Sequence, residues 1–134
     1  MSDSQRPKIT SFEDLIAWQR ARALARDVNL LCESEPLSRK FSFRDQLQRA
    51  AVSTMSNIAE GFDRGSRAEF HHMLSISKGS CAEVRSLLYV AVDAKFIDEP
   101  TFKTLSSQTH EVSRLIGALR ASVGRQRDQD RAAR

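Results

Sequence analysis

Residues 67–94 read RAEFHHMLSISKGSCAEVRSLLYVAVDA, and the spacing of apolar residues in this stretch decides the fold. Its apolar and small residues recur at alternating intervals of four and three: Phe70, Leu74, Ser77, Cys81, Val84, Leu88 and Ala91. Because an α-helix turns once in about 3.6 residues, this spacing places them all on one face. The stretch therefore predicts one long amphipathic helix of about 42 Å, at ~1.5 Å per residue.

Three further segments have the same period. The first follows the capping-box pattern TSFEDL (10–15) and extends to about residue 32, the second runs from about Ser42 to Gly61, and the last begins after Asp98 and ends at Val123. Short connections between amphipathic helices favour antiparallel neighbours. We therefore expect an all-α protein, an antiparallel up-and-down four-helix bundle.

The chain length of 134 residues fits one domain. We expect a bundle over residues 11–123, a flexible N-terminus over 1–10 and a flexible polar C-terminal tail over 124–134, because neither flank has an apolar stripe. The longest apolar run, Leu87 to Val92, is far shorter than the ~20 residues of a membrane span. We therefore expect a cytoplasmic protein without membrane contact, in which Cys32 and Cys81 are buried free thiols.

Three observations argue against an enzyme. The segment E69-F-H-H72 is a single Glu-x-x-His motif, whereas a ferritin-like metal site needs this motif on two helices and a glutamate from each of the others. No glycine-rich phosphate loop follows a strand, and Cys32 and Cys81 each lie in an apolar helical pattern, which favours packing over nucleophilic chemistry. We expect no metal, no cofactor and no catalytic residue, although the absence of a motif leaves an unrecognised chemistry open.

The net charge of +4 is carried by the two flanks, so the segment 11–119 has a net charge of zero. One local concentration of positive charge occurs inside that segment: Arg39, Lys40, Arg44, Arg49, Arg64 and Arg67. These residues are a candidate nucleic-acid patch, since arginine and lysine neutralise phosphates. The alternative is a solvated surface of ordinary salt bridges.

The segment SNIAEGFDRGS (56–66) raises a separate question, because polar side chains interrupt a helical pattern just before a turn. We interpret it as a structural joint or subunit contact, with a ligand contact and catalysis as the alternatives. The motif comprises Ser56, Asn57, Glu60, Gly61, Ser66 and Glu69. Glu60 and Asn57 can bond the backbone amides or arginines at the turn, and Ser66 can cap the next helix.

A second apolar stripe on the first helix, which includes Phe12 and Ile16, predicts contact with more than one neighbour. Gly79 lies in the middle of a helix, where glycine costs ~1 kcal/mol against alanine, so we expect a close helix crossing there. The candidate interface consists of Phe12, Ile16, Trp18 and Gly79.

Four segments together resemble a known family: FEDLIAW (12–18), QLQRAAVSTMSNIAEG (46–61), RGSRAEFHHML (64–74) and SKGSCAEV (77–84). They are similar to bacterial four-helix bundle proteins encoded by intervening sequences in large-subunit ribosomal RNA genes. The resemblance covers about residues 11–120. It implies a left-handed up-and-down bundle, a homo-oligomeric ring that is a pentamer, and no established enzymatic activity.

A related branch of that family is accessory to the reverse transcriptase of retroelements and binds nucleic acid through a positive surface, whereas the present chain has a neutral body. We therefore expect a non-enzymatic oligomeric scaffold or binding protein that associates with RNA or a ribonucleoprotein. The alternative is a protein-binding accessory subunit without direct nucleic-acid contact.

Overall fold

The computed structural model describes residues 8–134, and this part of the chain is a four-helix bundle. The long helices are α1 (Ile16–Cys32), α2 (Phe41–Asp63), α3 (Arg67–Asp93) and α4 (Glu99–Ala132), and residues 8–134 contain no strand. Two short 3-10 turns, η2 (Phe12–Asp14) and η3 (Leu37–Arg39), precede α1 and α2. The all-α class expected from the helical periodicity is confirmed.

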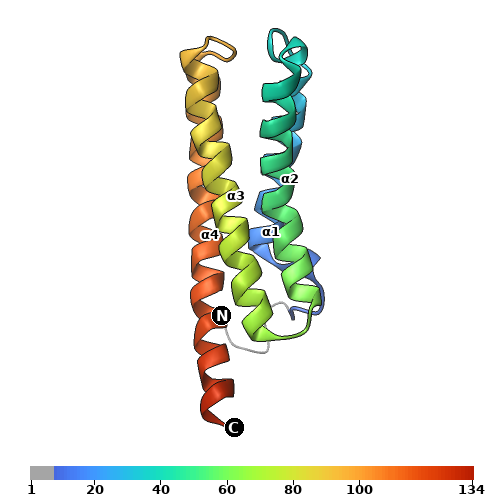
Figure 1. Ribbon diagram of the computed structural model, residues 1–134, viewed down its shortest axis with the longest axis vertical. Coiled ribbons are helices and arrows are strands. Elements are labelled where there is room, and N and C mark those ends of the chain that lie inside the picture. The colour runs from blue at the N-terminus through green and yellow to red at the C-terminus, as the bar shows by residue number, and fades with distance from the viewer. Residues whose placement is uncertain (1–7) are drawn as a thin grey trace.

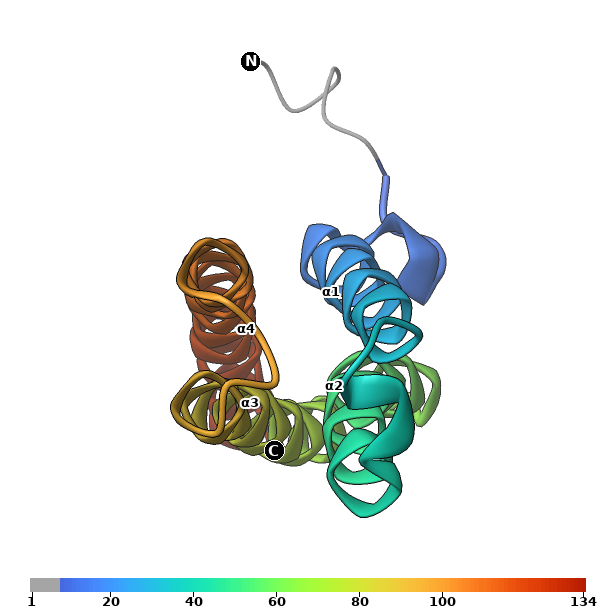
Figure 2. The same ribbon diagram turned by 90° about the horizontal axis from the view of Figure 1, so that it is seen from above.

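The helices are neighbours in chain order, and α1 also contacts α4 to close the bundle (Figure 2). Contacts between neighbouring helices join early positions of one helix to late positions of the next: Gln46 to Glu83 and Ser53 to Ser80 between α2 and α3, and His71 to Arg127 between α3 and α4. In Figure 1 the chain turns back at each connection. The handedness of the bundle stays a prediction.

The apolar stripes meet in a single core along the bundle axis. On α3, the predicted stripe of apolar and small residues is buried from Leu74 to Ala91, and Phe70 at its start is half-buried. Fully buried side chains from the other helices pack against it: Leu24 and Val28 of α1, Leu47 and Ile58 of α2, and Val112 and Ile116 of α4. Each such side chain contributes roughly 1.5–3 kcal/mol by its removal from water.

The starts of α3 and α4 use the capping residues that the sequence indicates. The Ser66 hydroxyl accepts the Glu69 N–H at 3.1 Å, and the Asp98 carboxylate accepts the Thr101 N–H at 2.9 Å. Hydrogen bonds from the Thr101 side chain and from its backbone N–H lower the pKa of Asp98. Between α2 and α3 the chain turns at Gly65, whose φ of +83° lies in the left-handed region that favours glycine.

The end of the last helix differs from the prediction. The sequence analysis ended the bundle at residue 123, whereas α4 continues to Ala132. Gly124 is buried against the His71 ring, and beyond it Arg127 and Asp130 bind residues of α3, so polar contacts continue where the apolar stripe stops. We call residues 125–132 the α4 extension. Of the predicted flexible N-terminus, residues 1–7 lie outside the described residues.

The expectation for Gly79 is wrong within this chain. A Cβ atom at Gly79 would have no heavy atom within 4 Å, and the residue is exposed. The close approach occurs at Gly61 instead, where a Cβ atom would lie 2.7 Å from the Cβ atom of Met73 on α3. None of the helices in residues 8–134 combines the length and apolar character that a membrane span requires.

Candidate nucleic-acid interface

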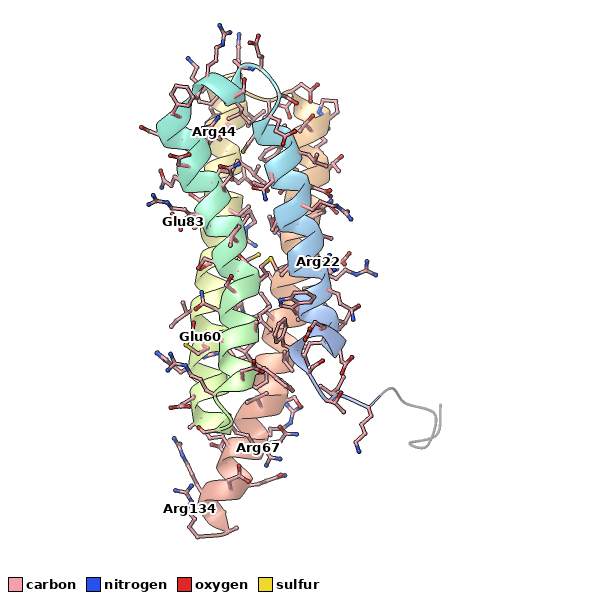
Figure 3. All side chains as sticks on the ribbon, turned by 90° about the vertical axis from the view of Figure 1, so that its right-hand side faces the viewer. Arg22, Arg44, Glu60, Arg67, Glu83 and Arg134 are labelled. Atoms are coloured by element: carbon pink, nitrogen blue, oxygen red, sulfur yellow. The ribbon has the colours of Figure 1, made fainter. Side chains whose placement is uncertain are left out.

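The structure separates the predicted basic patch into two ends. Arg39, Lys40 and Arg44 lie at the start of α2, whereas Arg64 and Arg67 lie beyond its end. At ~1.5 Å per residue, the twenty positions from Arg44 to Arg64 correspond to about 30 Å. Figure 3 shows Arg44 near one end of the bundle and Arg67 near the other. The six residues therefore do not form one continuous patch on a single chain.

Most of the positive charge at the first end is engaged locally. The Arg44 guanidinium donates to the Ser38 carbonyl oxygen at 2.8 Å and stacks 4.9 Å from the Phe41 ring centroid. Arg39 lies 3.6 Å from a Glu35 carboxylate oxygen, and the Lys40 ammonium lies 5.4 Å from the Phe96 ring centroid. These contacts anchor the connection between α1 and α2, which is a structural role.

Arg49 lies between the two ends, on the outer surface where α2 meets α3. It lines an open hollow of about 540 Å³ together with Asp45, Gln46, Ser53 and Glu83, among others. The carboxylates of Asp45 and Glu83 in the same wall oppose the charge of Arg49. The hollow is thus of mixed charge rather than basic.

At the other end, arginines from two distant parts of the sequence come together. An open hollow of about 640 Å³ lies between the start of α3 and the α4 extension, lined by Gly65, Ser66, Arg67, Ala68, Arg127, Asp130, Arg131 and Arg134. Arg67 binds Asp130 at 2.9 Å across the hollow. Figure 3 shows that this end of α4 projects past the start of α3 and carries Arg134 at its tip. We call Arg67, Arg125, Arg127, Arg131 and Arg134 the basic end.

The basic end is fixed to α3 by a short chain of hydrogen bonds. An Arg127 guanidinium nitrogen lies 3.1 Å from Nδ1 of His71, and Arg120 donates to the Ser75 hydroxyl oxygen at 2.7 Å. Ser75 in turn donates to the His71 carbonyl oxygen at 3.2 Å. Burial lowers the pKa of His71, and the neighbouring Arg127 and Arg120 lower it further.

The polar motif at residues 56–69 spans the end of α2, the turn and the start of α3. Glu60 binds Arg64 at 2.6 Å one turn later, as the sequence indicated, and Ser66 caps α3. Asn57 instead donates to the carbonyl and hydroxyl oxygens of Ser53 in its own helix, and the Ser53 hydroxyl lies 2.9 Å from that of Ser80 on α3. Ser56 and Glu69 are exposed. The hydrogen-bond partners of this motif belong to α2, α3 and the turn between them, and this geometry supports the structural interpretation.

The candidate interface residues have different environments. Phe12 and Trp18 pack edge to face with ring centroids 5.1 Å apart, and both lie against the core. Ile16 and Leu30, which belong to the second apolar stripe of α1, are 49% and 57% exposed. The exposed part of the stripe is therefore available to a partner, whereas its aromatic part stabilises the chain itself.

The structure offers little for metal or thiol chemistry. Within residues 8–134, no three histidine, cysteine, aspartate or glutamate side chains cluster as a metal site would require. Cys32 and Cys81 are free and buried, and burial raises the pKa of each thiol to about 11. Such thiols are protonated at neutral pH and are poor nucleophiles.

The sequence analysis missed the contribution of the α4 extension. Arg127, Arg131 and Arg134 were assigned to a flexible tail because the apolar period stops at Val123. A usable signal lies after Gly124, where the arginines are separated by two, four and three residues. The last three of them, Arg127, Arg131 and Arg134, recur about once per turn on a continuing helix. The partners His71 and Arg67 lie more than fifty residues away and could not be identified from spacing.

Fold and site together define a class of protein: a small all-helical bundle with a basic end and with no metal cluster or activated thiol among its described residues. The family model described as 23S rRNA-intervening sequence protein matches residues 13–118, so the chain belongs to that family.

A solved structure is similar in fold: a protein of unknown function from the S23 ribosomal protein family of Bacteroides thetaiotaomicron VPI-5482. The two chains are 22% identical, with a TM-score of 0.71, and the match covers 78% of this chain and 97% of the other. At this identity the likeness concerns the fold. A search of curated proteins gives no match. Neither the family nor this structural neighbour indicates an enzymatic activity.

Proposed function

We propose that the chain is a non-enzymatic, cytoplasmic binding protein that assembles with itself and contacts RNA through the basic end. The observation that carries the proposal is the convergence of Arg67, Arg127, Arg131 and Arg134 around one open hollow. The hollow is open, and arginine binds phosphate through two parallel N–H donors. The family description, which names a ribosomal RNA, favours RNA over other polyanions.

Charge at the basic end supports this choice. Its five arginines outnumber Asp128 and Asp130 by three. Asp130 forms a half-exposed pair with Arg67, which phosphate oxygens can replace at small cost, and Asp128 pairs with Arg127. Arg131 and Arg134 make no ion pair with another described residue, so we expect them to contribute most to binding.

Self-assembly would repeat the basic end by symmetry. The exposed apolar side chains of α1, Ile16 and Leu30, supply a surface for another copy, and the resemblance of the sequence implies a homopentamer. In a ring, equivalent basic ends lie on the same side of the assembly. A modest charge on each chain would then become a ring of positive charge, which attracts RNA more strongly than one copy does.

The test compares charge reversal at the two ends of the bundle. Arg131→Glu with Arg134→Glu changes the basic end, and Arg39→Glu with Lys40→Glu makes the same change in net charge at the opposite end. Affinity for a fluorescent single-stranded RNA is measured over a range of salt concentrations. The first double variant should bind at least ~10-fold more weakly at 0.1 M salt, and its salt dependence should fall by ~0.7 per lost phosphate contact. The second double variant should bind nearly as the unmodified protein does.

Two outcomes would contradict the proposal. Equal losses in both double variants would mean that only total charge matters, and no measurable binding by the unmodified protein at low salt would remove the RNA function. Light scattering on each variant serves as the control that the assembly is retained.

The alternative function is a protein-binding accessory subunit, and the exposure of Ile16 and Leu30 favours it. Here the α1 surface would hold a partner protein after assembly. Co-purification from nuclease-treated native extract separates the alternatives. A partner that is retained after nuclease treatment, and lost on Ile16→Ser with Leu30→Ser, supports the accessory function; a partner that nuclease releases supports the RNA function.

A further inference from the structure

The contact between His71 and Arg127 requires a neutral imidazole. A guanidinium has only N–H donors, so the ring nitrogen that faces it at 3.1 Å must accept. Nδ1 of His71 therefore carries no proton, and the proton of the neutral ring is on Nε2. Adding a proton to Nδ1 would place a donor against a donor and a positive charge against a positive charge.

The surroundings of His71 make this conflict difficult to relieve. Gly124 packs against the opposite edge of the ring so closely that a Cβ atom there would lie 3.2 Å from Cδ2 and 3.3 Å from Nε2. Arg127 is itself largely covered, with 23% of its side chain exposed. Gly124 therefore limits how far the ring can move, and the cover over Arg127 limits how far water can separate the two groups.

The charges around the ring reinforce this preference for the neutral form. Those that act on it come from α4: Arg127, Arg120 and Arg131 oppose its protonation, and Asp128 favours it. On its own helix, His72 is the adjacent residue, and Arg67 lies one turn earlier and binds Asp130. Among the described residues of α1 and α2, no charged group contributes to the pKa of His71.

We propose that the contact between His71 and Arg127 is a pH-sensitive switch that holds the α4 extension against α3. With His71 neutral, Arg127 holds the extension against α3; with His71 protonated, the two cations separate and residues 125–132 fray. Among the described residues, one ion pair joins the extension to α3, Arg67 with Asp130, and it is half-exposed at both partners. Acidification would thus release the segment that carries most of the basic end.

The sign of the pH dependence follows from the lowered pKa of His71. When the extension is frayed or unfolded, His71 has a pKa near its ordinary 6.5. This state therefore binds more protons than the state in which Arg127 contacts His71. The stabilisation is therefore complete above 6.5 and declines as the pH falls below it. Measurements at pH values on either side of 6.5 therefore follow the protonation of His71.

The experiment measures amide hydrogen exchange by mass spectrometry on the full chain at pH 5.5 and 7.5, corrected for intrinsic exchange rates. Protection of residues 125–132 should fall several-fold at the lower pH, up to a limit of about tenfold, which is the most that one histidine with an ordinary pKa of 6.5 can supply between these two pH values. His71→Gln keeps an acceptor that cannot titrate and should abolish the pH dependence. His72→Gln, at the neighbouring exposed position, is the matched control and should behave as the unmodified protein does.

Equal protection at both pH values in the unmodified protein would overturn the inference, as would a pH dependence that persists in His71→Gln. If His71→Gln does not fold, exchange at the imidazole C2 position of the unmodified protein gives the titration of His71 directly. Its midpoint must then coincide with the loss of protection in residues 125–132, and a mismatch would overturn the inference. RNA plays no part in these measurements, so they are independent of the proposed function.

Discussion

Gly61 and Gly79 are both helical glycines, yet an added methyl group would meet very different surroundings at the two positions. At Gly61 it would lie 2.7 Å from the Cβ atom of Met73, and at Gly79 it would have no heavy atom within 4 Å. We expect Gly61→Ala to lower the free energy of unfolding by about 1–3 kcal/mol because α2 and α3 must move apart. Gly79→Ala should raise it by up to ~1 kcal/mol through helix propensity.

Urea denaturation of both variants measures this difference, and equal effects would contradict it. The sequence analysis predicted a close helix crossing at Gly79 and placed Gly61 at the end of the second helix. A helical glycine is explained equally well by a near neighbour or by an exposed position that tolerates it. The neighbour that distinguishes the two cases comes from another helix, so spacing within α2 or α3 cannot reveal it.

Ser66 provides a second local test. Its hydroxyl oxygen accepts the Glu69 N–H at the start of α3, so Ser66→Ala should lower the free energy of unfolding by ~1 kcal/mol. Ser86→Ala, at an exposed position within the same helix, should be neutral or slightly stabilising. Thermal unfolding of the two variants decides the matter; a Ser66 variant as stable as the Ser86 variant would show that the cap contributes little.

The helices differ in how far their sequence determines them. The core face of α3 could be predicted from Leu74 to Ala91 because burial there follows one period without interruption. The α4 extension could not, because Arg127 and Asp130 are ordered by contacts with His71 and Arg67 rather than by an apolar stripe. A period reports which face of a helix is buried; it does not report polar partners that lie far away in the chain.

Removing residues 125–134 tests the role assigned to the extension. The deletion removes the exposed Arg67–Asp130 pair and the Arg127–His71 contact while leaving the apolar core untouched. We expect a loss of about 1 kcal/mol in the free energy of unfolding, together with a roughly tenfold or larger loss of RNA affinity. Unfolding of the shortened chain would show instead that the extension is essential to the bundle.

The proposed assembly would depend on surfaces that one chain leaves exposed. We expect Ile16→Ser with Leu30→Ser to convert the assembly to monomers, because these side chains are 49% and 57% exposed on α1. Val52→Ser with Ile76→Ser makes a matched change on α2 and α3, where the two residues are 42% and 41% exposed. Light scattering gives the mass of each. Dissociation of the second double variant alone would place the interface between copies on α2 and α3 and contradict the assignment to α1.

The positive patch illustrates why the candidate site was only partly predictable. Arg39 and Arg67 are close enough in sequence to suggest one surface, but α2 separates them by its full length. Arg67 instead joins arginines of the α4 extension about sixty positions later. Counting charges along the chain finds neither the separation nor the new grouping, because both depend on how the helices are placed beside one another.

The most direct test of the central claim is size-exclusion chromatography with light scattering and the ratio of absorbance at 260 and 280 nm, on freshly purified protein at low and at high salt. The proposed function predicts an assembly of about 75 kDa, five copies of the 15.1 kDa chain, that carries nucleic acid at low salt and loses it at high salt. A particle with the absorbance of protein alone at both salt concentrations, or a monomer, would contradict it.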